Sequence, residues 1–107
     1  MSTAPWRQEI ELIQNYTKHK TFTFTTSSSS AEDAVTLAGN MEEGNKVSFI
    51  VESADAYIAF DEDATTSSML IPENEGYFDD SIWFGTKISI IRAAGTNARI
   101  RGIVWGR

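Results

Sequence analysis

The chain of 107 residues contains no cysteine and one histidine. The lack of cysteine excludes disulfide bonds, thiolate metal ligands and a thiol nucleophile. His19 stands between Lys18 and Lys20, and no serine and acid are spaced around it as in a catalytic triad, so we expect it on the surface. A chain of this length predicts one domain, whose stability must come from a single packed core or from assembly with other chains.

Long apolar runs are also missing. No stretch approaches the roughly 20 apolar residues of a membrane-spanning helix, and the first residues, MSTAPWRQEIELIQNY, lack the apolar segment of a secretory signal. Phosphate-binding glycine loops are absent, and a formal net charge of -6 disfavours general nucleic-acid binding. We therefore expect a soluble protein made in a cytoplasm, with neither nucleic acid nor membrane as its partner.

Basic residues are absent from the middle of the sequence. No Lys or Arg occurs between Lys46 and Lys87, an interval that holds nine acids: Glu52, Asp55, Asp61, Glu62, Asp63, Glu73, Glu75, Asp79 and Asp80. From Lys87 onward all charged residues are basic: Lys87, Arg92, Arg99, Arg101 and Arg107. Such asymmetry concerns association rather than fold. It predicts a subunit that meets its neighbours through one acidic and one basic surface.

The sequence does show alternation with a period of two. Phe22 and Phe24 alternate with threonines, and Val47, Phe49 and Val51 alternate with more polar residues, as in strands with one buried face. We predict strands at 20–26, 34–39, 46–53, 56–60, 69–78, 81–86, 87–94 and 98–107. Pro72 marks the 69–78 segment as a sheet edge or corner. The predicted fold is all-β: a single β-sandwich or jelly roll of roughly seven to eight short antiparallel strands.

The predicted domain organisation is an N-terminal arm at 1–20 and the sandwich at 21–107. Trp6, Ile10 and Ile13 fall at helical spacing, whereas EIEL alternates as a strand does, so we expect an extended arm that starts with a short helical turn. Terminal segments are poorly ordered unless something holds them. Trp6 is suited to hold this arm on a neighbouring subunit.

Seven residues are candidates for contact with a partner. Ile82, Trp83 and Phe84 are consecutive, so at least one of them should point away from the core of a strand. An outward aromatic side chain favours an interface. Together with the arm and the basic C-terminal region, the candidates are Trp6, Ile10, Trp83, Phe84, Arg92, Arg99 and Arg101.

The stretch AYIAFDEDATTSSMLIPENEGYFDD at 56–80 gathers carboxylates and raises two chemical alternatives. Asp61 and Asp63, followed by Ser and Thr, could ligate calcium, but the glycine and distal glutamate of an EF-hand are missing. A carboxylate pair could act as in glycosidases, but these acids lie in turns, where water keeps both ionised. We predict a solvated hairpin that protects a sheet edge, and we assign no catalytic residue, cofactor or metal.

The larger aromatic residues leave a carbohydrate-binding role open. Trp83, Trp105, Tyr57, Tyr77 and Phe84 could stack on sugar rings. In a domain of this size, large aromatic side chains also supply much of the core. We favour the core or a subunit interface for them.

The segment KVSFIVESADAYIAFDEDATTSSMLIPENEGYFDDSIWFGTKISIIRAAGTNARIRGIVWG, residues 46–106, resembles small virion proteins of tailed bacteriophages. In that family a strand like AYIAF leads to an acidic turn, a segment like SMLIPENEGYF follows, and two strands like KISIIRAAGTNARIRGIVWG close a jelly roll. The resemblance implies a non-enzymatic capsid decoration or cement protein that binds the major capsid protein, often as a homotrimer, and is located in the virion. A tail, neck or baseplate component is an alternative, as is a module that binds host-surface glycan.

Overall fold

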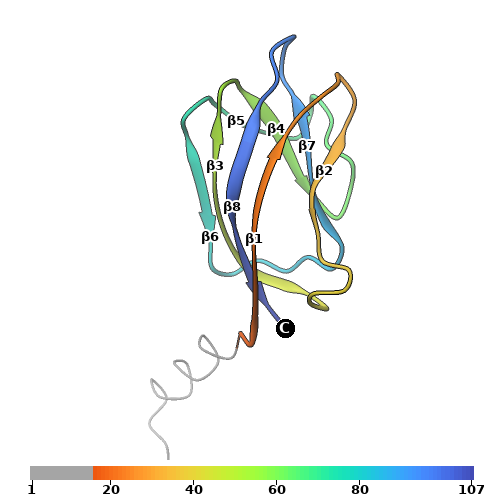
Figure 1. Ribbon diagram of the computed structural model, residues 1–107, viewed down its shortest axis with the longest axis vertical. Coiled ribbons are helices and arrows are strands. Elements are labelled where there is room, and N and C mark those ends of the chain that lie inside the picture. Colours follow the sequence, from red (N-terminus) through yellow and green to blue (C-terminus); the bar gives the residue numbers. More distant parts are fainter. Residues whose placement is uncertain (1–15) are drawn as a thin grey trace, which may run out of the picture.

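The computed structural model describes residues 16–107, which form eight strands and no helix (Figure 1). The strands are β1 (Lys18–Thr25), β2 (Glu32–Thr36), β3 (Gly44–Glu52), β4 (Ala56–Phe60), β5 (Met69–Ile71), β6 (Gly76–Asp79), β7 (Lys87–Arg92) and β8 (Arg99–Gly106). They build two four-stranded sheets, so the prediction of an all-β sandwich is confirmed.

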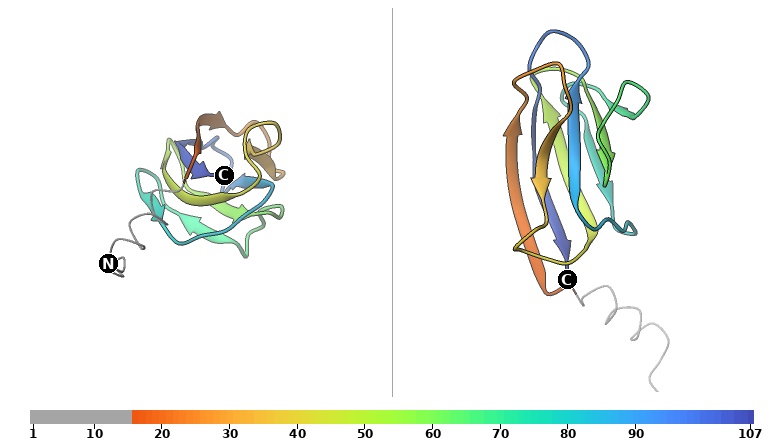
Figure 2. Two further views of the ribbon diagram at one scale, coloured as in Figure 1. Left: turned by 90° about the horizontal axis from the view of Figure 1, so that it is seen from below. Right: turned by 90° about the vertical axis from the view of Figure 1, so that its right-hand side faces the viewer.

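Every strand pair is antiparallel. Sheet A has the order β1-β8-β3-β6, and sheet B has the order β2-β7-β4-β5. Only β4 and β5 are consecutive strands that pair, so every other connection crosses from one sheet to the other. The view along the strands in Figure 2 shows the two sheets enclosing one interior. The start of β1 and the C-terminus lie at the same end of the sandwich, drawn at the bottom of Figure 1, which we call the lower end.

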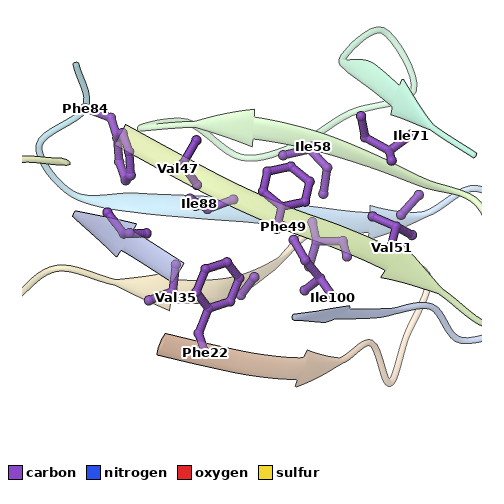
Figure 3. Packing of buried hydrophobic residues seen from close by; sticks show 14 of the residues in the cluster. Phe22, Val35, Val47, Phe49, Val51, Ile58, Ile71, Phe84, Ile88 and Ile100 are labelled. Carbon is purple, nitrogen blue, oxygen red and sulfur yellow. The ribbon is translucent and has the colours of Figure 1, made fainter. Parts of the chain in front are cut away.

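The core forms because alternate side chains of each strand point into the space between the sheets. β3 contributes Val47, Phe49 and Val51, and the neighbouring β8 contributes Ile100 and Val104; all are buried. Sheet B contributes Ile58, Ile71 and Ile88 from the opposite side (Figure 3). Ile90 of β7 belongs to the same core cluster. Burial of each such side chain stabilises the fold by about 1.5–3 kcal/mol before the entropic cost is counted.

One row of the core contains a glycine among three aromatic residues. The register places Phe22, Gly102, Phe49 and Tyr77 side by side across β1, β8, β3 and β6. The rings of Phe49 and Tyr77 are 5.4 Å apart between centroids. A Cβ on Gly102 would lie 2.2 Å from the carbonyl oxygen of Ser48 and 2.5 Å from Cβ of Phe49. Gly102 therefore allows β8 to approach β3 beside two bulky side chains.

The structure corrects several strand boundaries. The strand predicted at 56–60 is β4, but the 69–78 segment is two strands, β5 and β6, which lie at the edges of different sheets. The prediction that this segment is an edge or corner is therefore confirmed. The 81–86 segment is not a strand, since it makes a single bridge between Phe84 and Gly44. β1 begins at Lys18, so residues 18–20, predicted as part of the arm, belong to sheet A.

Candidate protein-binding surfaces

The outer face of sheet A carries a group of large apolar side chains that are exposed or half-buried. Ile103 and Trp105 of β8 point away from the core, because the alternate residues Ile100 and Val104 are buried. Ile50 of β3 is 37% exposed, and Phe78 of β6 is 58% exposed. Ser48 pairs with both Ile103 and Phe78, which brings these residues into one band across the sheet. We call Ile50, Phe78, Ile103 and Trp105 the apolar stripe.

Basic side chains flank the apolar stripe. Arg99 and Arg101 project from β8 on the same face, and both contact Glu52 of β3, with nitrogen–oxygen distances of 3.1 and 2.8 Å. Arg101 also donates from Nη2 to the other carboxylate oxygen at 2.9 Å, so this pair is bidentate. The hydrogen bond from Arg101 is the main cause that lowers the pKa of Glu52, with Arg99 adding to it against the opposing effect of burial.

Lys46 completes the charge of this face. Its Nζ lies 4.7 Å from the ring centroid of Trp105 and 5.6 Å from that of Phe78. Such cation–π contacts keep the ammonium group over the aromatic rings at an exposed site. With three cations (Lys46, Arg99, Arg101) and one anion (Glu52), the strands of this face carry a net charge of about +2 in a chain whose net charge is -6.

The outer face of sheet B has a smaller apolar row with acidic surroundings. Tyr57 pairs with Leu70 on one side and with Ile91 on the other, and all three point outward because Ala56, Ile58 and Ile90 are buried. Leu70 is 47% exposed. We call Leu70, Tyr57 and Ile91 the sheet B row. At its end stand Asp55 and Glu73, joined by a hydrogen bond of 2.7 Å from the Glu73 amide to the Asp55 carboxylate.

The acidic loop at 61–68 is fastened to the fold through its carboxylates. Asp61, at a φ of 61°, accepts hydrogen bonds from the amides of Gly85 (2.7 Å), Thr86 (2.7 Å) and Lys87 (3.2 Å), and from the Thr86 hydroxyl (2.8 Å). Burial opposes ionisation, but these hydrogen bonds outweigh it and lower the pKa of Asp61 below its ordinary value. Asp61 therefore replaces the backbone partners that residues 85–87 would have in a sheet.

The rest of this loop covers part of the outer face of sheet B. The amide of Ala64 donates to the buried Ser89 hydroxyl at 2.9 Å. Lys87 forms salt bridges with Asp33 of β2 and Asp63 of the loop, and its hydrogen bonds to the two carboxylates raise its pKa. Lys87 is the one cation on the outer face of sheet B within residues 16–107. Over the same range, the acidic and histidine side chains form no cluster able to hold a metal ion.

A shallow cleft of about 380 Å³ opens on the side where β5 and β6 form the two sheet edges. Its lining is largely apolar, with Phe60, Met69, Tyr77 and Ile82 among its residues, and Glu62 adds a carboxylate. The Tyr77 hydroxyl donates to Asp79 at 3.0 Å. Burial, followed by this contact with Asp79, raises the pKa of Tyr77.

The predicted interface residues fall in different places. Trp83 is 66% exposed in the β6–β7 connection, while the adjacent Phe84 is completely buried in the core. Phe84 is therefore corrected from an interface candidate to a core residue, because its bridge with Gly44 holds it against the core while Trp83 stays exposed. Arg99 and Arg101 lie together on the outer face of sheet A.

Arg92 holds a loop rather than facing outward. It pairs with the buried Ala56, which places it on the inner side of sheet B, and its Nη1 donates to Asn97 at 2.7 Å in the β7–β8 connection. Trp6 and Ile10 lie outside the described residues.

Two exposed residues of the apolar stripe, Ile50 and Phe78, were not predicted from the sequence. A signal was available for each. Ile50 stands at a position of β3 shared with Ser48 and Glu52, where a polar side chain is expected, and Phe78 follows Tyr77, so that one of the two rings must point outward.

Comparison of the whole chain with protein family models, curated protein sequences and solved structures finds no match. In the region that the structure describes, no helix is long and apolar enough to span a membrane.

Proposed function

We propose that the chain is a non-enzymatic structural subunit whose activity is to bind other protein subunits. The observation that carries this proposal is the apolar stripe: four large apolar side chains gathered on the outer face of a sheet and flanked by arginines. Isolated apolar residues are common on protein surfaces, whereas a contiguous group rimmed by charged residues is typical of interaction sites. Aromatic residues and arginine are also the types enriched in protein interfaces.

The setting we propose is the virion of a tailed bacteriophage, where the chain decorates the capsid and binds the major capsid protein. The resemblance of residues 46–106 to small virion proteins supports this setting. The strand pairing supports a jelly roll: β1 pairs with β8, β2 with β7, β3 with β6 and β4 with β5, as in a long antiparallel ribbon wrapped into two sheets. Jelly rolls are a recurrent architecture of viral capsid domains.

The roles of the carboxylates favour a structural function over a catalytic one. Asp61 is saturated by hydrogen bonds from residues 85–87, and Glu52 is held by two arginines. Asp79 binds the Tyr77 hydroxyl and the Ser81 amide. Asp61 and Glu52 each fasten one segment of the fold to another, and Asp79 holds the turn at the end of β6. A general acid would instead need a carboxyl group with a raised pKa facing a substrate.

We assign contact with the capsid shell to the lower end of the sandwich. Trp83 is exposed in the β6–β7 connection, which Figure 1 places at that end. β1, the first strand after residues 1–15 in the chain, begins at the same end. Residues 1–15 include Trp6 and Ile10, the predicted contacts of the arm. Several weak contacts repeated over a symmetric lattice combine into strong binding through avidity.

The test is the copy number of this chain in purified phage particles, measured by quantitative mass spectrometry against the major capsid protein. Hundreds of copies are expected for a decoration protein, whereas about a dozen would place it in the tail, neck or baseplate. Absence from the particle would refute the virion setting.

Binding of host-surface glycan is the second candidate function. It is favoured by the cleft between the sheet edges, which combines the aromatic rings of Phe60 and Tyr77 with the carboxylate of Glu62. Small-molecule sites commonly join apolar walls with a few polar groups in this way. The wild-type chain is expected to give a saturable signal on a glycan array, and Tyr77→Ala is expected to abolish that signal. An array without signal for the wild-type chain would refute glycan binding.

A further inference from the structure

We infer that two copies of this chain associate head to tail, with the outer face of sheet A of one copy packed on the outer face of sheet B of the next. This inference rests on the proposed function, because it names the occupant of the surface assigned there to subunit binding. The apolar stripe is one half of the contact, and the sheet B row of Leu70, Tyr57 and Ile91 is the other.

Charge decides which faces can meet. The outer face of sheet A carries Lys46, Arg99 and Arg101 against Glu52. A two-fold contact between two such faces would place like charges against one another, which disfavours association by opposing encounter and docking.

The outer face of sheet B is complementary. Its only cation among the described residues, Lys87, is already paired with Asp33 and Asp63, while Asp55 and Glu73 at the end of the sheet B row make no salt bridge with a described residue. The arginines of one copy can therefore face carboxylates of the next while the two apolar groups are buried together.

The two faces lie on opposite sides of the same sandwich, so each copy presents both halves of the contact. A contact between two different faces is heterologous, and it repeats until the assembly closes into a ring or continues as a filament.

Two charge-introducing variants separate the faces. Phe78→Glu blocks the outer face of sheet A, and Leu70→Glu blocks the outer face of sheet B; both side chains are exposed in the monomer, so folding is expected to survive. Ala94→Glu, at an exposed position of the β7–β8 connection, is the control for added negative charge. The melting curve of each full-length variant verifies its fold.

Sedimentation velocity of the purified full chain, at concentrations up to about 1 mM, gives the readout. We expect wild type and Ala94→Glu to self-associate, and each blocked variant alone to be monomeric, with affinity reduced at least about tenfold. An equimolar mixture of the two blocked variants should form a one-to-one heterodimer that grows no further, because each partner contributes its intact face.

Three results would overturn the inference: a monomeric wild type, self-association of Leu70→Glu alone, or no heterodimer in the mixture. Self-association of Leu70→Glu that Phe78→Glu abolishes would identify a two-fold contact between sheet A faces instead. A monomeric wild type that is still present in hundreds of copies per particle would refute contact between copies and leave the proposed virion function intact.

Discussion

Substitution of Gly102 by alanine tests the packing of the core most directly. The added Cβ would lie 2.2 Å from the Ser48 oxygen, 2.5 Å from Cβ of Phe49 and 2.7 Å from its Cα. Two of these atoms belong to the backbone of β3, so no side-chain rotation relieves the contact. To reach ordinary van der Waals separation, β8 and β3 must move apart by roughly 1 Å at this point.

Such a shift cannot be made locally, because β8 lies between β1 and β3 and pairs with both. Overpacking a core usually lowers the free energy of unfolding by about 1–3 kcal/mol. We expect a larger loss here, because the clash is with backbone atoms and β8 is paired on both sides. We expect Gly102→Ala to lower the free energy of unfolding by about 4 kcal/mol. For a domain of about 100 residues this corresponds to a fall in Tm of roughly 15–30 °C.

The assay is urea unfolding and thermal melting followed by circular dichroism, with Gly95→Ala as the matched control. A Cβ on Gly95 meets no atom within 4 Å, so that variant should change stability by less than about 0.5 kcal/mol. If Gly102→Ala melts within a few degrees of Gly95→Ala, about 1 kcal/mol or less, the inferred close approach of β8 to β3 is refuted.

Further predictions concern the charged and exposed residues. Asp61→Asn should lower the free energy of unfolding, measured in urea, by about 2 kcal/mol, because a neutral amide replaces a carboxylate that accepts four hydrogen bonds. Asp61→Ala should lower it by about 1 kcal/mol more, because alanine is disfavoured at the positive φ of this position. Equal stability of wild type and Asp61→Asn would contradict this prediction. Asp61 and Glu52 have lowered pKa values in the folded state, so their contribution is complete above the unfolded values of about 4 and is lost as pH falls through the folded values. Unfolding measured from pH 7 to pH 2 should therefore show stability falling below about pH 4, less steeply in Asp61→Asn than in wild type. Trp83→Ala should change the free energy of unfolding by less than about 0.5 kcal/mol while weakening binding to phage particles. Unchanged binding would contradict the assignment of the lower end as the surface that contacts the capsid shell.

Much of the fold follows from the local pattern of the sequence. The alternation of Val47, Phe49 and Val51 placed the buried face of β3 correctly, and that of Phe22 and Phe24 did so for β1. These assignments succeed because burial of one face of a strand fixes its register with a period of two. Pro72 likewise marked the point where the chain leaves sheet B, since proline cannot donate to a sheet ladder.

The strand boundaries that were predicted incorrectly depend on contacts with residues far away in the sequence. The 81–86 segment has the composition of a strand, but the amides of Gly85 and Thr86 donate to the Asp61 side chain instead of to a neighbouring strand. β1 starts at Lys18 because β8 continues to Gly106 and offers it a partner there. Neither contact leaves a local signature, so sequence patterns predict the existence of these elements better than their ends.

The candidate surfaces were harder to predict than the core. Arg99 and Arg101 could be placed together from their spacing in one strand, whereas Ile50 and Phe78 join them only through the pairing of β3 with β8 and β6. A surface that spans several strands exists only after the sheet order is known, and the sheet order is set by the sum of all pairings.

The pairing of the first strand with the last has a consequence for biosynthesis. Thr25 pairs with Arg99, and β8 also separates β1 from β3 in sheet A. While the ribosome is still making residues before β8, sheet A lacks one of its two central strands, and β1 and β3 expose edges that can pair with other chains. Because loop closure over such a distance is slow, the sandwich should be completed only once β8 has been made, in one step that inserts β8. A nascent chain that stalls or is cut before Arg99 would then be a target for chaperones and proteases rather than a partly working subunit.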